Sequence, residues 1–210
     1  HVLQNLDVDV LYEVPLVMEE EHLAQVACEC LNLPCPQPDL KDWTAMIDAW
    51  KHPEKDVTVA LVGKYTQLHD AYISVVEALK HGGIDNRAVV NIKWIDSETV
   101  TEENADELFG DVTGILVPGG FGSRGIDGKI TAIKYAREHK IPFLGLCLGM
   151  QLSIVEYARN VAGLDGAHSI ELDPNTQYPV IALMPDQNGV EDIGGTLRLG
   201  SFPCVLDKTS

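Results

Sequence analysis

Short apolar runs alternate with helical patterns from residue 57 onward. The runs predict strands at residues 57–62, 89–95, 115–117, 143–146 and 180–184. Between the first two strands, apolar residues at helical spacing predict a helix that Asp70 would cap and Gly82-Gly83 would end. Ile126, Ile130 and Ile133 mark another helix. This alternation predicts an α/β fold: an open, mostly parallel sheet with helices on both faces.

The pattern before residue 57 is different. Residues 8–12 resemble a short strand, and the acidic residues 19–21 open a helix that ends at the proline-rich stretch 34–38. A second helix follows from Asp39 to the residues before Pro53. Such short helices bury little surface alone, so we expect this part to belong to another domain that tethers the next.

Composition narrows the class of protein. The chain has 210 residues, of which 45% are hydrophobic and 22% charged, as in ordinary globular domains. A formal charge of −17 argues against nucleic-acid binding, which needs clustered lysine and arginine. No apolar run approaches the ~18 residues of a membrane helix, and the first residues lack a secretion signal. We therefore expect a cytoplasmic protein without nucleic-acid or membrane partners.

Four of the five cysteines carry no motif. Cys28, Cys30 and Cys35 are too closely spaced for a usual zinc site, so they are interpreted as reduced thiols, and Cys204 lies in a tail segment. No metal site is expected. Gly63-Lys64 also lacks the spacing of a phosphate-binding loop, and ordinary packing at a strand end suffices for it.

The fifth cysteine lies in Gly145-Leu-Cys147-Leu-Gly149-Met150-Gln151, directly after an apolar run. This pattern is typical of a nucleophile elbow, whose strained turn leaves no room for side chains two positions on either side. Cys147 would begin the next helix, where unpaired N–H groups favour a thiolate. The alternative is a small, buried structural cysteine.

A second glycine cluster favours the catalytic interpretation. Pro118-Gly119-Gly120-Phe121-Gly122, the glycine loop, also follows a predicted strand, and one helix separates it from Cys147. Strands joined in this way are parallel, so both loops open on the same edge of the sheet. Backbone amides of the glycine loop could then stabilise a tetrahedral oxyanion beside Cys147.

Several motifs in order resemble the CTP synthase family. They are Gly63-Lys64-Tyr65, Asp70-Ala71-Tyr72, residues 77–83, the glycine loop with Arg124-Gly125, residues 145–151 and residues 194–200. The resemblance implies a class I glutamine amidotransferase domain of flavodoxin-like fold at residues 57–210. It also implies the end of a synthetase domain at residues 1–38 and a helical interdomain linker at 39–56.

The resemblance assigns roles to individual residues. Cys147 would attack the carboxamide of glutamine, with Gly120 and Leu148 as oxyanion donors. Gly149, Met150 and Gln151 would line the glutamine pocket, and Glu171 would hold the charged end of the substrate. Arg198 matches a lid tied to GTP activation. Leu6, Asp7 and Val8 match a stretch that lies against ATP in the synthetase domain.

One part of the family pattern is absent. Class I amidotransferases need a histidine and a glutamate in a His-x-Glu motif after the cysteine. The later histidine, His168, is followed by Ser169-Ile170. His52-Pro53-Glu54 has the sequence of the family's catalytic motif but lies in the expected linker. We interpret it as a chance match, unless the linker folds over the elbow. We therefore expect the chain to be part of a longer enzyme, truncated before this motif.

For that longer enzyme, the resemblance implies conversion of UTP to CTP. ATP and magnesium would activate the uracil oxygen, and ammonia from glutamine would displace the phosphate. GTP would activate and CTP would inhibit a tetramer, whereas this piece could be monomeric and lack turnover alone.

Two alternatives remain at this point. Another elbow-cysteine hydrolase, such as a γ-glutamyl hydrolase, would share residues 145–149 but lack the signatures at 63–72 and 194–200. A non-catalytic interaction module with a vestigial cysteine would also lack a His-x-Glu motif.

Overall fold

The computed structural model describes residues 2–183 and 205. By its internal contacts the chain divides into two compact units, His1–Leu152 and Ser153–Ser210. In the described part, no helix is both long and apolar enough to cross a membrane. Each unit is considered by itself below.

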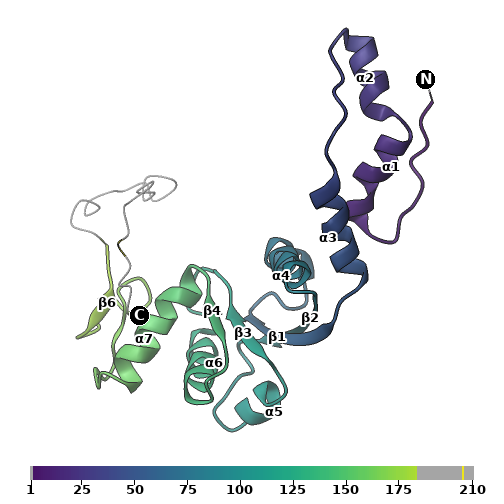
Figure 1. Ribbon diagram of the computed structural model, residues 1–210. Coiled ribbons are helices and arrows are strands. Elements are labelled where there is room, and N and C mark those ends of the chain that lie inside the picture. Colours follow the sequence, from purple (N-terminus) through teal and green to yellow (C-terminus); the bar gives the residue numbers. More distant parts are fainter. Residues whose placement is uncertain (1, 184–204, 206–210) are drawn as a thin grey trace. The chain divides into compact units, whose positions relative to one another are not determined.

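The first unit is built on a parallel sheet (Figure 1). Its strands are β1 (Lys55–Gly63), β2 (Ala88–Asp96), β3 (Gly114–Val117) and β4 (Phe143–Gly145). They lie in the order β2-β1-β3-β4, and every neighbouring pair is parallel. The sheet confirms the predicted fold class, and the predicted strand boundaries are correct to within two residues.

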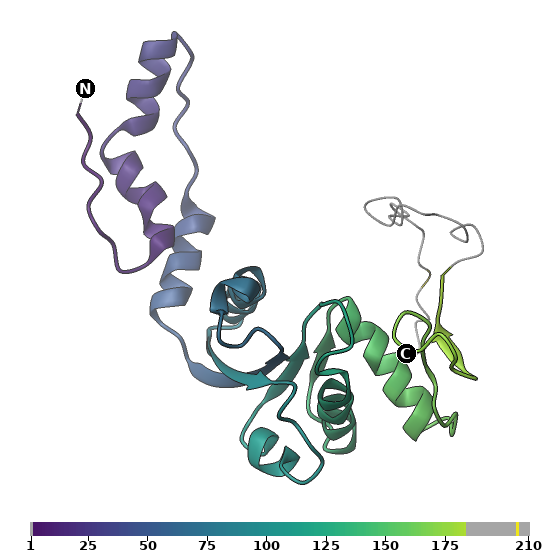
Figure 2. The same ribbon diagram turned by 180° about the vertical axis from the view of Figure 1, so that it is seen from behind.

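Helices cover both faces of this sheet. Helix α4 (Ile73–Asp85) lies on one face, and α5 (Ala105–Phe109) and α6 (Ile126–Glu138) lie on the other (Figures 1 and 2). Right-handed crossovers require this arrangement, because the chain steps one way from β1 to β2 and the other way from β2 through β3 to β4. Helix α7 (Leu148–Asn160) follows β4 and continues into the second unit.

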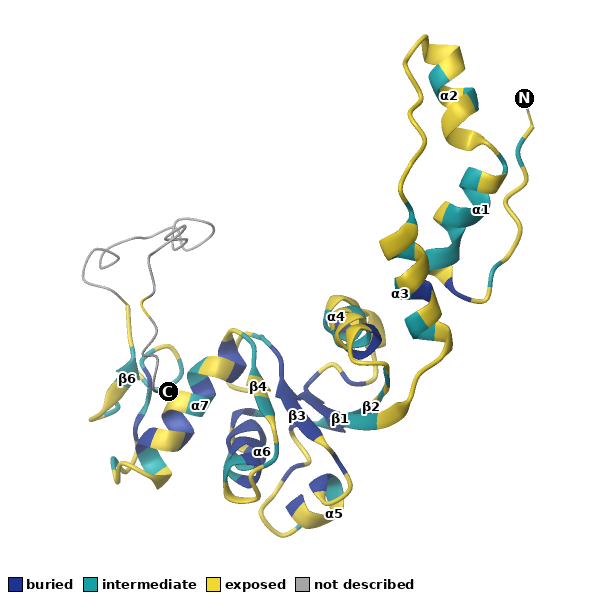
Figure 3. Cartoon of the chain, in the orientation of Figure 1, coloured by how far each residue is buried: buried dark blue, intermediate teal, exposed yellow. Residues whose placement is uncertain are grey.

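The core lies between the central strands and these helices (Figure 3). All four residues of β3 are buried, as expected of a strand that is covered on both faces. Leu61 and Leu116 form a buried cluster with Tyr72, and Val75 and Leu79 of α4 pack against it, among other apolar side chains.

Helix α4 corrects two predicted boundaries. Asp70 lies in a 3₁₀ turn, His69–Tyr72, and no side chain caps α4, whose N-cap residue is Tyr72. Gly82 and Gly83 lie inside the helix, which continues to Asp85. Close packing explains Gly83: a Cβ there would lie 2.6 Å from the carbonyl oxygen of Ala88. That glycine lets the helix approach β2 and does not end it.

The N-terminal segment is helical. It contains the 3₁₀ turn η1 (Leu11–Glu13), α1 (Val14–Glu20), α2 (Leu23–Leu31) and α3 (Lys41–Lys51). The predicted strand at residues 8–12 is wrong: these residues pair with no strand in the described chain, and Pro15 in the first turn of α1 favours the start of a helix. His22, with φ of 60°, separates α1 from α2, so the acidic residues 19–21 lie at the end of α1 and do not open the predicted helix, which begins at Leu23.

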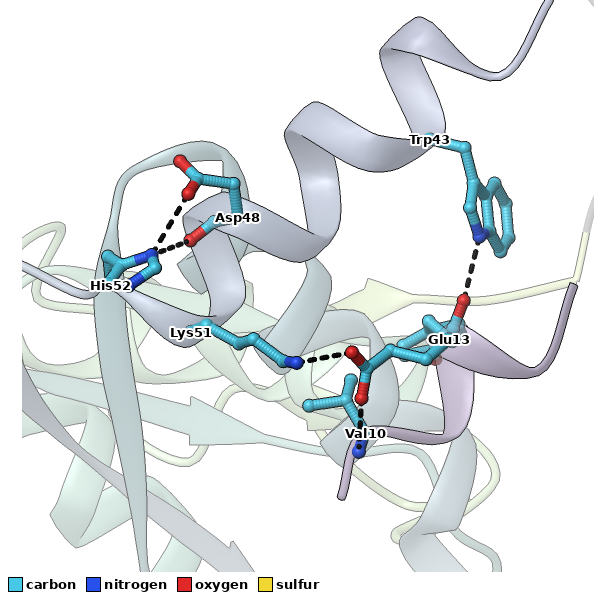
Figure 4. Close-up of polar contacts among 7 residues, drawn as sticks. Val10, Glu13, Trp43, Asp48, Lys51 and His52 are labelled. Carbon is cyan, nitrogen blue, oxygen red and sulfur yellow. Dashed lines mark hydrogen bonds and ion pairs between the residues drawn. The ribbon is translucent and has the colours of Figure 1, made fainter. Parts of the chain in front are cut away.

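Contacts of η1 hold this segment together (Figure 4). The indole N–H of Trp43 donates to the carbonyl of Tyr12 at 2.7 Å, and Lys51 pairs with Glu13. The Tyr12 hydroxyl donates to Glu77 of α4 at 3.0 Å. The segment is thereby joined to the sheet domain by specific polar contacts as well as by the chain.

Two short strands lie in the described part of the second unit. β5 (His168–Ser169) pairs in parallel with β6 (Pro179–Ile181). The predicted strand at 180–184 is thus present but starts and ends earlier, and residue 184 lies outside the described residues.

We expect Leu61→Ala to destabilise the protein by about 2–5 kcal/mol, because it removes a fully buried side chain from the core cluster. Leu68→Ala, at a position that is 62% exposed, is the matched control and should change stability by less than about 0.5 kcal/mol. Urea unfolding of both variants tests this. Equal effects would show that the core is not where the structure places it.

Candidate functional site

Three loops meet at the carboxyl edge of the sheet. Residues 64–66 follow β1, the glycine loop (residues 118–122) follows β3, and residues 146–147 follow β4. The strand order reverses direction between β1 and β3. Ligands of open α/β sheets bind at such a point, outside the carboxyl ends of the strands.

The turn after β4 has the geometry of a nucleophile elbow. Cys147 has φ of 52°, in the left-handed region that residues other than glycine and asparagine rarely adopt. The cysteine is exposed. A Cβ on Gly145 would lie 2.5 Å from the carbonyl carbon of Gly149. A Cβ on Gly149 would lie 2.1 Å from the carbonyl oxygen of Val117. Both glycines are therefore required by the close backbone packing of this turn.

The glycine loop lies directly beside the elbow. A Cβ on Gly119 would be 3.3 Å from the Cys147 Cβ and 3.9 Å from its Sγ. A Cβ on Gly120 would be 3.8 Å from a methyl carbon of Leu148, the first residue of α7. The first amides of a helix have no partner within that helix. The structure therefore brings both predicted oxyanion donors, Gly120 and Leu148, to the cysteine.

The remaining elbow residues lie in the first turn of α7. The amide of Gln151 donates to the carbonyl of Cys147 at 3.1 Å. Met150 is 52% exposed, and Gln151 is half-buried. Both follow Cys147 closely enough to border a ligand at the thiol.

Two lysines also lie beside Gly120 of the glycine loop. A Cβ on Gly120 would be 3.6 Å from Cε of Lys64 and 3.8 Å from Nζ of Lys129. The Lys64 ammonium donates to the carbonyl of Phe121 in the loop. Lys64 thus does more than the strand-end packing expected from the sequence, because it bonds directly to the loop.

Lys129 is fully buried, and its amine has no hydrogen-bond partner among the described residues. Burial, together with the smaller effect of the nearby charge of Lys64, lowers the pKa of Lys129 from 10.5 to about 8. Sequence reasoning missed this residue. The sequence could have indicated it, because Lys129 lies three residues after Ile126 and four before Ile133. This spacing places it on the apolar face of α6.

Ser97, at the end of β2, also has a buried hydroxyl without a partner. A Cβ on Gly125 would lie 2.2 Å from that hydroxyl, and one on Gly128 would lie 1.8 Å from the Ser97 carbonyl oxygen. The start of α6 is therefore packed against the end of β2, which fixes the helix that carries Lys129.

Other predicted site residues lie elsewhere. Glu171 is exposed in a turn of the second unit, where its amide donates to the hydroxyl of Ser169 at 3.3 Å. Leu6, Asp7 and Val8 precede η1 in irregular chain. Arg198 lies outside the described residues.

His52 lies at the opposite edge of the sheet from Cys147. It is the residue after α3, and its Nδ1 is 3.0 Å from a carboxylate oxygen of Asp48 (Figure 4). It precedes β1, whereas Cys147 follows β4, which is parallel to β1 through β3. The nine residues of β1 separate the two edges by about 30 Å. His52-Pro53-Glu54 therefore cannot form a relay with Cys147 in this fold.

Among residues 2–183 and 205, no group of three or more His, Cys, Asp or Glu side chains is placed to hold a metal ion.

The profile of the family described as glutamine amidotransferase class-I matches residues 67–209 of this chain. The chain therefore belongs to the class I glutamine amidotransferases, as the sequence motifs predicted.

Individual relatives indicate a narrower group within this family. Proteins named CTP synthase from Clostridium acetobutylicum and Lactococcus lactis are 58% and 56% identical over 99% and 100% of this chain. The chain spans 39% of the length of each of these relatives. A solved structure titled "Trypanosoma brucei CTPS - glutaminase domain with bound acivicin" is 38% identical, with a TM-score of 0.60, and the match covers 64% of this chain and 52% of that one.

We expect Gly149→Ala to be strongly destabilising, by about 2 kcal/mol or more, because its Cβ would collide with a backbone oxygen that cannot move alone. Gly82→Ala in α4 is the matched control. Nothing lies within 4 Å of its Cβ position, so the better helix propensity of alanine should stabilise the protein by up to about 1 kcal/mol. Opposite signs in thermal unfolding would support the packed elbow, and two neutral variants would contradict it.

Lys129→Met should stabilise the protein at pH 7. The unfolded chain keeps this proton up to a pKa of 10.5, whereas the folded chain releases it near pH 8. The lysine therefore opposes folding fully below pH 8, by up to about 3 kcal/mol, and the free energy of unfolding rises between pH 8 and 10.5.

The measurement is urea unfolding of the native protein and Lys129→Met at pH 7 and pH 10. The gain from the substitution should shrink at the higher pH. A gain that does not depend on pH would contradict the lowered pKa of Lys129.

Proposed function

We propose that this chain forms the glutaminase part of a glutamine-hydrolysing CTP synthase, with Cys147 as the nucleophile. The single observation that carries the proposal is the strained elbow: an exposed cysteine at φ of 52°, whose Sγ would lie 3.9 Å from a Cβ on Gly119 of the glycine loop. A structural cysteine has no need for such a turn. The names of the relatives direct the proposal to glutamine and to CTP synthesis.

The chemistry follows from the site. The Cys147 thiolate adds to the carboxamide carbon of glutamine, and the electron pair of the C=O bond moves onto oxygen. We propose that the amides of Gly120 and Leu148 stabilise that oxyanion, and the distance of 3.8 Å from a Cβ on Gly120 to a methyl carbon of Leu148 supports this. The intermediate then expels ammonia, whose nitrogen takes up a proton, and leaves a γ-glutamyl thioester. Water hydrolyses the thioester to glutamate and restores the thiol.

The proposal also assigns residues to the binding of glutamine. We propose that Gly149, Met150 and Gln151 border the side chain of glutamine, because they lie in the turn that begins at Cys147. The carboxylate of Glu171 would pair with the ammonium group of the substrate. Arg198, in the segment 194–200, would belong to a lid that responds to GTP.

The remaining activity belongs to the complete enzyme. There, ATP and magnesium would activate UTP, ammonia would convert it to CTP, and CTP would inhibit the assembled tetramer. Leu6, Asp7 and Val8 would contact the ATP site. In this proposal residues 1–38 belong to the synthetase domain, 39–56 to the linker and 57–210 to the amidotransferase domain. A histidine and a glutamate from outside this chain would protonate the leaving ammonia and activate water.

We also propose a cytoplasmic location. Cys28, Cys30, Cys35 and Cys147 are all free thiols, and thiols stay reduced in the cytosol. Nucleotide substrates favour the same compartment.

The first test is covalent labelling. The chloromethyl ketone analogue of glutamine should alkylate Cys147 with loss of chloride, and intact mass spectrometry should show one adduct per chain. Cys147→Ala should abolish the adduct, whereas Cys30→Ala, at another exposed thiol, should leave it unchanged.

Free glutamine should compete with this labelling. Labelling that is equal at Cys30 and Cys147, or indifferent to glutamine, would rule out the glutaminase assignment. It would favour an interaction module that has kept the fold without the reaction.

A further inference from the structure

Lys129 is a charged side chain in a buried, apolar environment that disfavours charge. Its neighbours on α6, Ile126, Ile130 and Ile133, are buried apolar residues. The lysine itself is fully buried, and its Nζ has no hydrogen-bond partner in the part of the chain that the structure describes. An unbranched apolar side chain such as methionine would fill the same space without the cost of burying an unpaired amine.

The charges around Lys129 do not compensate for it. Lys64, from the end of β1, adds a second positive charge and lowers the pKa of Lys129 in the same direction as burial. From the loop after β2, the Glu98 carboxylate lies 3.0 Å from the guanidinium of Arg124, which precedes α6. The nearby acid is therefore already engaged with another cation.

What lies next to the amine is the glycine loop. The Lys129 Nζ would be 3.8 Å from a Cβ on Gly120, and the Cys147 Sγ would be 3.9 Å from a Cβ on Gly119. Gly120 therefore faces the lysine, and Gly119, the residue before it, faces the thiol. Negative charge that forms at Cys147 would therefore form beside the same loop that the Lys129 ammonium faces.

We propose that Lys129 is a positioning residue of the glycine loop: its charged amine acts through Gly119 and Gly120 to promote attack by Cys147. This inference rests on the glutaminase function proposed above. The amine has no partner in the free protein and gains an opposite charge only as the thiolate or the oxyanion forms. An interaction that is stronger in the transition state than in the ground state accelerates the reaction.

The proposal fixes a dependence on pH. The amine is charged below its pKa of about 8, so its effect should be complete at pH 7 and lost as the pH rises through 8. Rate constants are therefore compared as ratios of two proteins at the same pH.

The experiment measures the second-order rate constant for labelling of Cys147 by the chloromethyl ketone analogue of glutamine between pH 6.5 and 9.5. The ratio of native protein to Lys129→Met should be roughly tenfold at pH 7, below the ~10²-fold cost of removing an oxyanion donor. It should approach one at pH 9.5. Lys129→Arg, which stays charged, should retain the native rate at pH 7.

Lys134→Met is the matched control. It removes a lysine from the same helix, where the amine pairs with Glu102 at 2.6 Å, and its ratio should stay near one at every pH. If Lys129→Met does not fold, the ratio of native protein to Lys129→Arg replaces it and should fall as the pH passes 8.

Two failures are distinguishable. Selective labelling of Cys147 with a ratio that is one, or that does not change with pH, would overturn the role of Lys129 and leave the glutaminase function intact. Absence of selective labelling in the native protein would overturn both.

Discussion

The carbonyl oxygen of Val117, at the end of β3, is the point on which the site depends. It accepts a hydrogen bond from the amide of Leu146 at 2.9 Å, which continues the pairing of β3 with β4 past the last strand residue. A Cβ on Gly149 would lie only 2.1 Å from the same oxygen. The start of α7 is thus pressed against the end of β3. The thiol of Cys147 has to lie at the tip of this turn, next to the loop that Val117 itself begins.

The parallel sheet makes this contact possible. Parallel strands joined by right-handed crossovers all present their carboxyl ends at one edge, so loops that are distant in sequence become neighbours there. The same rule separates His52 from Cys147, because His52 precedes β1 and lies at the other edge. Topology therefore decides which histidine can take part in catalysis, whatever motif surrounds it. The contact of His52 with Asp48 then belongs to the C-terminal end of α3.

Much of this arrangement could be predicted from the sequence, because glycine spacing and apolar runs report on backbone packing. Gly145, Gly149 and the glycine loop indicated the elbow and its neighbour correctly. The strand at residues 8–12 could not be judged in this way, since a strand exists only with a partner and the local pattern does not name one. Gly83 was misjudged for a related reason: a glycine that ends a helix and one that lets a helix approach a strand look alike in sequence. Lys129 went unnoticed because a lysine is normally exposed.

Lys129 also links stability to reactivity. A buried, unpaired amine lowers the free energy of unfolding at neutral pH, and natural proteins keep such a cost mainly where function requires it. If the lysine served only to fill space, methionine would serve better at every pH, and reactivity at Cys147 would not depend on the choice. If Lys129 weakens the fold but promotes the reaction, a single variant, Lys129→Met, should be more stable and its Cys147 should be less reactive. Neither the burial of Lys129 nor its pKa alone separates a structural role from a functional one. Opposite changes in stability and in the reactivity of Cys147 do separate them.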